Sequence, residues 1–129
     1  MTPNLKVLYV EDDPDIRTVT EFALEDEGFE LCSCASGQAA LEQAESATWD
    51  LILLDVMMPG MDGPTTLRRL REVPGLAAIP VLFMTAKVQP PELAQYLTMG
   101  AIGVIAKPFD PLTLGGQIRQ QLQEARHGR

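Results

Sequence analysis

Charged and hydroxyl side chains follow several of the apolar runs in this 129-residue chain. They are Glu11-Asp12-Asp13, Asp55, Thr85 and Lys107. Carboxylates held about 4 Å apart repel one another by several kcal/mol at an intermediate dielectric constant, so a cluster of them requires either protonation or a bound cation. Magnesium suits a site that offers one or two carboxylates, water molecules and a phosphate oxygen. We therefore expect these residues to form a Mg²⁺ site if the fold brings them together.

Asp55 is the best candidate for a nucleophile in such a site. It stands alone after the apolar residues 51–54, whereas residues 11–13 form the group whose charge must be neutralised. Transfer of a phosphoryl group to a carboxylate requires an Asp nucleophile, a metal ion that neutralises the phosphoryl oxygens, and cationic and hydroxyl donors around them. Taken alone, Asp55 is equally well explained as a solvated strand-end carboxylate or a helix cap. Its combination with Lys107 and the acidic group favours phosphoryl transfer.

Apolar runs alternate with helix-like stretches along the whole chain. The apolar runs predict strands at 5–10, 29–34, 51–54, 79–84 and 103–106. Helices are predicted from Pro14 to about Glu27, after Ser36 to about Ala47, from Pro64 to about Glu72, from Pro90 to Gly100 and from Asp110-Pro111 to about Ala125. Proline suits the first position of a helix, and glycine suits the left-handed residue that ends one, as at Gly28. The last helix contains Gly115 and Gly116, which each cost about 0.8 to 1 kcal/mol relative to Ala, so we expect this helix to be mobile.

This alternation indicates an α/β fold. Five strands and five helices with short connections imply an open parallel sheet covered by helices on both faces. In such sheets, ligands bind beyond the carboxyl ends of the strands, where the strand order reverses. Residues 11–13, Asp55, Thr85 and Lys107 all come at the ends of predicted strands, so a parallel sheet places them at one edge.

Length and charge narrow the classes of protein to which the chain can belong. We assign residues 1–129 to one domain, with a flexible tail at 125–129. Ten Lys and Arg against eighteen Asp and Glu give a net charge of −8, which argues against a nucleic-acid ligand. No apolar run approaches the roughly twenty residues of a membrane span, and the first residues do not resemble a signal peptide, so we expect no membrane association and a cytoplasmic location. Cys32 and Cys34 are expected to be buried, reduced thiols rather than a redox or metal pair.

Four stretches of the sequence form an ordered set of motifs. They read VLYVEDDPDIR at 7–17, DVMMPGMDG at 55–63, TA at 85–86, and GAIG at 100–103 followed by KPF at 107–109. In this order they resemble the motifs of the response-regulator receiver domains of two-component signalling, over nearly the entire chain. The resemblance implies a flavodoxin-like (βα)5 three-layer sandwich with a five-stranded parallel sheet of order 2-1-3-4-5. It also implies a CheY-like phosphorelay protein that is not an enzyme, although it assists its own phosphotransfer and autodephosphorylation.

The resemblance implies a role for each residue around Asp55. Asp55 would accept phosphate from a histidine kinase or a phosphotransfer protein, and Asp12, Asp55 and the Met57 main-chain carbonyl would bind Mg²⁺. Glu11 would help through a metal-bound water. Asp13 is better explained as the cap of the first helix than as a metal ligand.

Three further residues belong to the switch that the family uses. The resemblance implies that Lys107 pairs with Asp55 before transfer and with a phosphoryl oxygen afterwards, while the Thr85 hydroxyl moves to another phosphoryl oxygen. It also suggests a cis peptide bond before Pro108. Many receivers carry Tyr or Phe three residues before the Lys, but this chain has Val104. We therefore expect a smaller rearrangement of the face formed by the fourth helix, fifth strand and fifth helix, through which a downstream target or output domain would bind.

Two other functions agree with parts of the pattern. A haloacid-dehalogenase-type phosphatase also forms an aspartyl phosphate with Mg²⁺, but its general acid stands two residues after the nucleophile, where this chain has Met57. A pseudo-receiver that acts only as a phosphorylation-independent interaction module is disfavoured, because every expected phosphorylation residue is present. The sequence allows either a stand-alone receiver or a part of a longer regulator.

Overall fold

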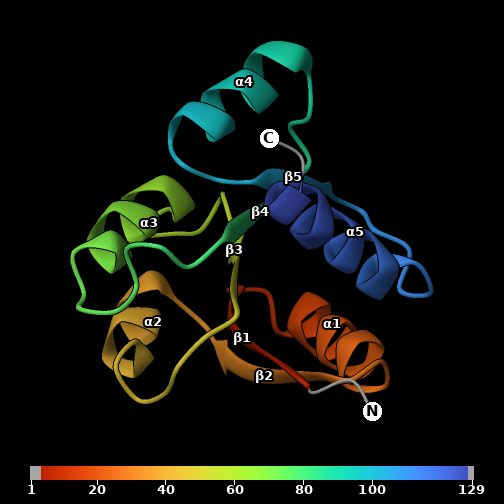
Figure 1. The fold of residues 1–129 in the computed structure, drawn as a ribbon, viewed down its shortest axis with the longest axis horizontal. Coiled ribbons are helices and arrows are strands. Elements are labelled where there is room, and N and C mark those ends of the chain that lie inside the picture. The colour runs from red at the N-terminus through yellow and green to blue at the C-terminus, as the bar shows by residue number, and fades with distance from the viewer. Residues whose placement is uncertain (1–3, 128–129) are drawn as a thin grey trace.

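The structure is a computed structural model that describes residues 4–127. Its strands are β1 (Leu5–Val10), β2 (Phe29–Cys34), β3 (Leu51–Asp55), β4 (Val81–Thr85) and β5 (Gly103–Ala106). Its helices are α1 (Pro14–Glu25), α2 (Gly37–Gln43), α3 (Gly63–Arg71), α4 (Pro90–Thr98) and α5 (Leu114–His127). The strands form one parallel sheet in the order β2-β1-β3-β4-β5, which confirms the predicted architecture (Figure 1).

Helices cover both faces of the sheet (Figure 1). On one face, side chains of β1, β3 and β4 pack with those of α2, α3 and α4 in a cluster that includes Leu54, Leu70 and Tyr96. On the other face, the strands pack with α1 and α5 in a cluster that includes Leu24 and Ile118. Each fully buried Leu or Ile side chain contributes about 1.5 to 3 kcal/mol relative to an exposed one. The sheet is therefore a buried middle layer, which holds the ends of its strands in a fixed register.

Helices begin where side chains cap their free main-chain N–H groups. Asp13 accepts hydrogen bonds from the N–H groups two and three residues further on, at 2.8 and 3.2 Å, which confirms its predicted role as the cap of α1. Ser36 and Asp62 cap α2 and α3 through the N–H groups three residues further on, at 3.1 and 2.9 Å. Gly28 and Gly100 follow α1 and α4 with φ of +88° and +102°. This is the left-handed conformation predicted for Gly28, and it is typical of a glycine that ends a helix.

The predicted start of the last helix at Asp110-Pro111 is wrong, because α5 begins at Leu114. Residues 111–113 form a turn instead. The Asp110 carboxylate accepts from the N–H group two residues later at 2.9 Å, and its main-chain carbonyl accepts from the two N–H groups after that, both at 3.1 Å. These bonds complete a turn ahead of the regular helix. At its other end α5 runs to His127 and so includes residues 125–127 of the expected tail, while 128–129 lie outside the described residues.

Several other boundaries differ from the prediction by a few residues, and two of them have a clear cause. α2 ends at Gln43 rather than near residue 47, because side chains bind its last carbonyl groups: Ser46 Oγ donates to the Gln43 carbonyl at 2.7 Å, and Trp49 Nε1 donates to the next carbonyl at 2.9 Å. β4 begins at Val81 rather than at residue 79. Pro80 has no N–H group and therefore precedes the strand.

Two expectations concern membranes and thiols. Within residues 4–127, no helix combines the length and the apolar composition that crossing a bilayer requires.

Cys32 and Cys34 are free, with Cys34 buried and Cys32 half-buried. Burial, followed by the neighbouring Cys32, raises the pKa of the Cys34 thiol to about 12. A protonated, buried thiol is unreactive, which agrees with the structural role expected for Cys34. The predicted burial of Cys32 is wrong, because its side chain is only partly buried.

Candidate functional site

The carboxyl ends of four strands bring the predicted site residues to one edge of the sheet. Glu11 follows β1, Asp55 ends β3, Thr85 ends β4 and Lys107 follows β5. Three of these side chains are buried: Glu11 is 1% exposed, Asp55 3% and Thr85 2%. Because charged groups are rarely buried to this extent without partners, the cluster must satisfy them in a specific way.

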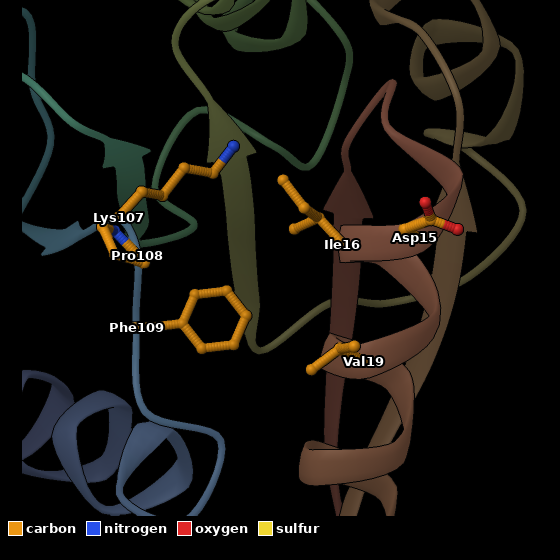
Figure 2. A pocket seen from close by; sticks show the side chains of 6 residues that line it. All are labelled: Asp15, Ile16, Val19, Lys107, Pro108 and Phe109. Carbon is orange, nitrogen blue, oxygen red and sulfur yellow. The ribbon is translucent and has the colours of Figure 1, made fainter.

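Lys107 links the two buried carboxylates. Its Nζ donates to Asp55 Oδ1 at 3.0 Å and lies 2.8 Å from Glu11 Oε1. The ammonium group extends toward the end of β3 (Figure 2). Because one ammonium group faces two carboxylates, it neutralises only part of their charge. The peptide bond between Lys107 and Pro108 is cis, as the resemblance suggested.

Burial and the neighbouring charges shift the pKa values of both Asp55 and Lys107. Burial raises the pKa of Asp55 to about 7, an effect that the hydrogen bond from Lys107 opposes and repulsion by Glu11 increases. Burial alone lowers the pKa of Lys107, but its contacts with Glu11 and Asp55 outweigh burial and raise it. Lys107 therefore stays charged at neutral pH, while a further cation beside Asp55 would favour the ionised form of this carboxylate.

Asp12 completes an acidic cluster that fits a hard divalent cation. Glu11, Asp12 and Asp55 each place one carboxylate oxygen so that all three atoms lie within 4.8 Å of one another. Glu11 Oε1 is buried and receives no hydrogen bond, although it forms an ion pair with Lys107. A donor set made only of oxygens suits Mg²⁺, which keeps several water ligands of its own. Three carboxylates beside one ammonium group leave net negative charge for such an ion to offset.

Gly63, at the start of α3, holds the loop after β3 close to Asp55. Its N–H group donates to the Val56 carbonyl at 2.9 Å. A Cβ atom at Gly63 would overlap the main-chain oxygen of Asp55, so a larger residue requires the main chain of Asp55 to move. Met57 lies in the same loop, with its side chain 63% exposed. The sequence placed Gly63 in the motif at 55–63 but gave it no role of its own, because a close approach between two main chains leaves no mark on composition.

Two contacts hold the loop after β1. Glu11 Oε2 accepts a hydrogen bond from Asp13 N at 3.2 Å. Arg17 Nη1 donates to the main-chain carbonyl of Glu11 at 2.8 Å. The sequence placed Arg17 in the first motif without giving it a role, since a hydrogen bond from a side chain to a carbonyl group six residues earlier produces no periodic pattern. The motif was the only signal that pointed to it.

Thr85 lies at the edge of the cluster. Its Oγ1 accepts a hydrogen bond from Lys87 N at 3.0 Å. A hydroxyl group that accepts one hydrogen bond can donate its own proton at the same time. Thr85 can therefore serve as a donor to an anion bound near the carboxylates.

Val104 borders a pair of aromatic rings. It is half-buried on β5 and packs against the cluster that contains Phe83 and Tyr96. The Phe83 and Tyr96 ring centroids are 5.3 Å apart, and Tyr96, on α4, is 6% exposed. The aromatic side chains in this part of the molecule therefore come from β4 and α4, and the position on β5 carries only an isopropyl group.

Two hollows flank the acidic cluster. One, of about 250 Å³, lies between α1 and the segment after β5; Ile16, Val19 and Phe109 form its apolar wall and Lys107 its rim (Figure 2). The other, of about 560 Å³, lies between the loop after β3 and α4 and includes Lys87. Lys107 lines the first hollow, and Val56 and Met57, which follow Asp55, line the second, so each hollow lies next to part of the predicted site.

Comparisons with known proteins agree with this arrangement. The sequence profile of the response regulator receiver domain matches residues 7–119. The chain is 36% identical over 127 residues to the transcriptional regulatory protein CseB of Streptomyces coelicolor, covering 98% of this chain and 53% of that protein. It is 33% identical over 122 residues to the alkaline phosphatase synthesis transcriptional regulatory protein PhoP of Bacillus subtilis, covering 95% of this chain and 50% of that protein. The chain thus spans about half the length of the curated relatives it matches.

A solved structure supports the same assignment. The chemotaxis response regulator CheY4 of Vibrio cholerae superposes with a TM-score of 0.85 at 33% sequence identity. The match covers 92% of this chain and 98% of that one. The similarity therefore extends over the sheet, its helices and the edge that carries the acidic cluster.

Proposed function

Because the chain belongs to the response regulator receiver domains, which are signalling modules, we propose that Asp55 accepts a phosphoryl group from a histidine kinase or a phosphotransfer protein. One observation carries the proposal. The buried Asp55 carboxylate lies 3.0 Å from Lys107 Nζ and belongs to the same oxygen cluster as Glu11 and Asp12. This combination supplies a nucleophile, a cation and a place for a metal ion at one point.

The proposed reaction moves one phosphoryl group between two proteins. Asp55 Oδ2 attacks phosphorus, since Oδ1 accepts a hydrogen bond from Lys107. The bond between phosphorus and the donor's imidazole nitrogen breaks as the new bond forms. The imidazole takes the electron pair of that bond and leaves as neutral histidine, because its other nitrogen carries a proton. Mg²⁺ held by Asp12, Asp55 and the Met57 carbonyl, with Glu11 acting through a water, would neutralise charge on the phosphoryl oxygens.

Transfer would change the partners of the residues around Asp55. The new group carries a charge of about −1.5 to −2 at neutral pH. Lys107 would exchange Asp55 for a phosphoryl oxygen, and the Thr85 hydroxyl would donate to another. Because both residues stand at the ends of strands that contact α4 and α5, their movement would alter the face that α4, β5 and α5 form.

The same face is the proposed surface for a downstream partner. Leu97 and Met99 at the end of α4 are 53% and 39% exposed, which provides apolar side chains for a protein contact. The relatives named above are transcriptional regulators about twice as long as this chain. We therefore propose that the partner is a target protein or an output domain, and that nucleic acid does not bind this domain directly. We assign it to the cytoplasm, where reducing conditions keep Cys32 and Cys34 as thiols.

Intact-protein mass spectrometry tests the phosphoacceptor. After incubation with a small acyl phosphate and Mg²⁺, the protein is expected to gain the mass of one phosphoryl group. The gain is expected to disappear with a chelator, in Asp55→Asn, and after treatment with hydroxylamine, which cleaves acyl phosphates. Asp50→Asn is the matched control because Asp50 lies beside the opposite end of β3, where its carboxylate accepts from Lys6 N at 2.8 Å.

Three outcomes would contradict the proposal. Equal labelling of Asp55→Asn and the parent would place the phosphoryl group elsewhere. No labelling of the parent by either a small donor or a phosphorylated histidine-containing protein would indicate an interaction module. Sustained turnover of phosphate esters would indicate a phosphatase.

A further inference from the structure

We propose that Arg17 is a positioning residue for the magnesium site, because its guanidinium group fixes the peptide between Glu11 and Asp12 and so orients both carboxylates. The inference rests on the proposed function, since it assumes that Mg²⁺ binds these residues. It adds a residue that touches neither the metal nor the phosphoryl group.

Hydrogen bonds hold the main chain of Glu11 on both sides of its Cα atom. Its N–H group donates to the Cys34 carbonyl on β2 at 3.0 Å. Its carbonyl accepts from Arg17 Nη1 on α1 at 2.8 Å. The second bond holds the peptide plane that continues into Asp12. The directions in which the Glu11 and Asp12 side chains leave the main chain therefore depend on one bond to the sheet and one bond to Arg17.

The Arg17 end of this bond is itself held in place. The Asp13 carboxylate caps α1, and Arg17 N donates to the Asp13 carbonyl at 2.9 Å in the first turn. Asp13 N also donates to Glu11 Oε2 at 3.2 Å. The first turn of α1 therefore holds the loop that carries the acidic residues. Among the described residues, Arg17 is the only charged side chain that donates a hydrogen bond to the main chain of this loop. A hydrogen bond with a charged donor is stronger than a neutral one.

The direction in which Mg²⁺ affinity changes when Arg17 is removed distinguishes a positioning role from a purely electrostatic one. Arg17 carries a positive charge near a site for a dication, so by Coulomb's law its removal should strengthen Mg²⁺ binding. A positioning role predicts the opposite, because a released Glu11–Asp12 peptide lets the carboxylates leave the geometry that the ion requires. Loss of a group that orients a metal ligand typically weakens metal affinity 10- to 100-fold.

Calorimetric titration with MgCl₂ tests the proposal on the whole chain. Arg17→Met is expected to raise the Kd for Mg²⁺ about tenfold, at the lower end of the range for groups that orient ligands. Arg17→Lys keeps the charge but replaces the planar donor with a flexible ammonium group, so its Kd is expected to lie between those of the parent and Arg17→Met. The matched control is Arg119→Met. Arg119 on α5 donates in the same way to the main-chain carbonyl of Glu27, beyond the opposite end of α1, and its loss is expected to leave the Kd unchanged.

The outcomes distinguish the two proposals. Mg²⁺ binding by Arg17→Met that equals or exceeds the parent's would overturn the positioning role and leave the magnesium site intact. Equal weakening in Arg17→Met and Arg119→Met would also overturn it. If Arg17→Met does not fold, Arg17→Lys decides: weaker binding than the parent supports the role, and equal or tighter binding overturns it. A parent protein that binds no Mg²⁺ contradicts the proposed function itself.

Discussion

Asp55 and Glu11 share one ammonium group although both carboxylates are buried. The pKa of Asp55 rises to about 7 because burial outweighs the hydrogen bond from Lys107. Under the proposed function, Asp55 would have to be ionised both to bind a metal ion and to attack phosphorus. Burial makes this ionisation costly until a cation arrives, and the cost is measurable in the protein without metal.

The folding stability of the metal-free protein is expected to fall as the pH rises from about 4 to about 7. The pKa of Asp55 is about 7 in the folded state and 3.8 ordinarily, so over this interval the folded state binds more protons than the unfolded state. The stabilising contribution of protonated Asp55 is complete below the lower value and is lost as the pH passes the higher one. At about 1.4 kcal/mol per pKa unit, the change is on the order of a few kcal/mol.

Asp55→Asn should remove this part of the pH dependence. Asn cannot ionise, and its side-chain oxygen can still accept from Lys107. Urea unfolding in chelator near pH 5 and near pH 8, on either side of the titration, is expected to show a larger stability gain for Asp55→Asn at the higher pH. An equal gain, or none, at both pH values would show that Asp55 titrates normally.

At the scale of elements, the sequence predicted the strands and most helix starts, but not the contacts that loops make with the elements next to them. The apolar run 51–54 predicts β3 and is followed by Asp55, and Asp13 followed by proline predicts the start of α1. Both signals are visible in the sequence because strand burial and helix capping depend on residues that are neighbours in the chain. The close packing of Gly63 against Asp55 and the bond from Arg17 to Glu11 join segments that only the folded chain brings together. Composition and periodicity carry no information about such contacts.

Gly115 and Gly116 look alike in the sequence but have different surroundings in α5. A Cβ atom at Gly115 would overlap Glu27 Oε1, whereas one at Gly116 would meet nothing within 4 Å. Gly116→Ala is expected to stabilise the protein by up to about 1 kcal/mol, because Ala has less backbone entropy to lose in a helix. Gly115→Ala should gain less, since the Glu27 side chain must move.

Chemical denaturation of the two variants and the parent measures this difference. The contrast also tests the expected mobility of α5, because a helix that opens readily would benefit from alanine at both positions alike. A gain for Gly115→Ala equal to that for Gly116→Ala would mean that the contact with Glu27 is not maintained in solution.

At the scale of the whole molecule, the proposed function requires a signal to pass from Asp55 to the surface formed by α4, β5 and α5. Val104 provides no aromatic ring on β5, while Phe83 and Tyr96 pack against each other between β4 and α4. We therefore expect phosphorylation to shift the amide resonances of this surface only modestly. Two-dimensional NMR before and after addition of an acyl phosphate measures the change, and shifts absent from α4, β5 and α5 would exclude this face as the output surface.

Chemical trapping of the acyl phosphate tests the central claim most directly. Borohydride reduces an aspartyl phosphate to homoserine, which peptide mass spectrometry assigns to a single position. After phosphorylation in Mg²⁺ and reduction, homoserine is expected at position 55, and omission of either the donor or Mg²⁺ should abolish it. Homoserine at another acidic position such as Asp12, or at none, would contradict the assignment of Asp55 as the phosphoacceptor.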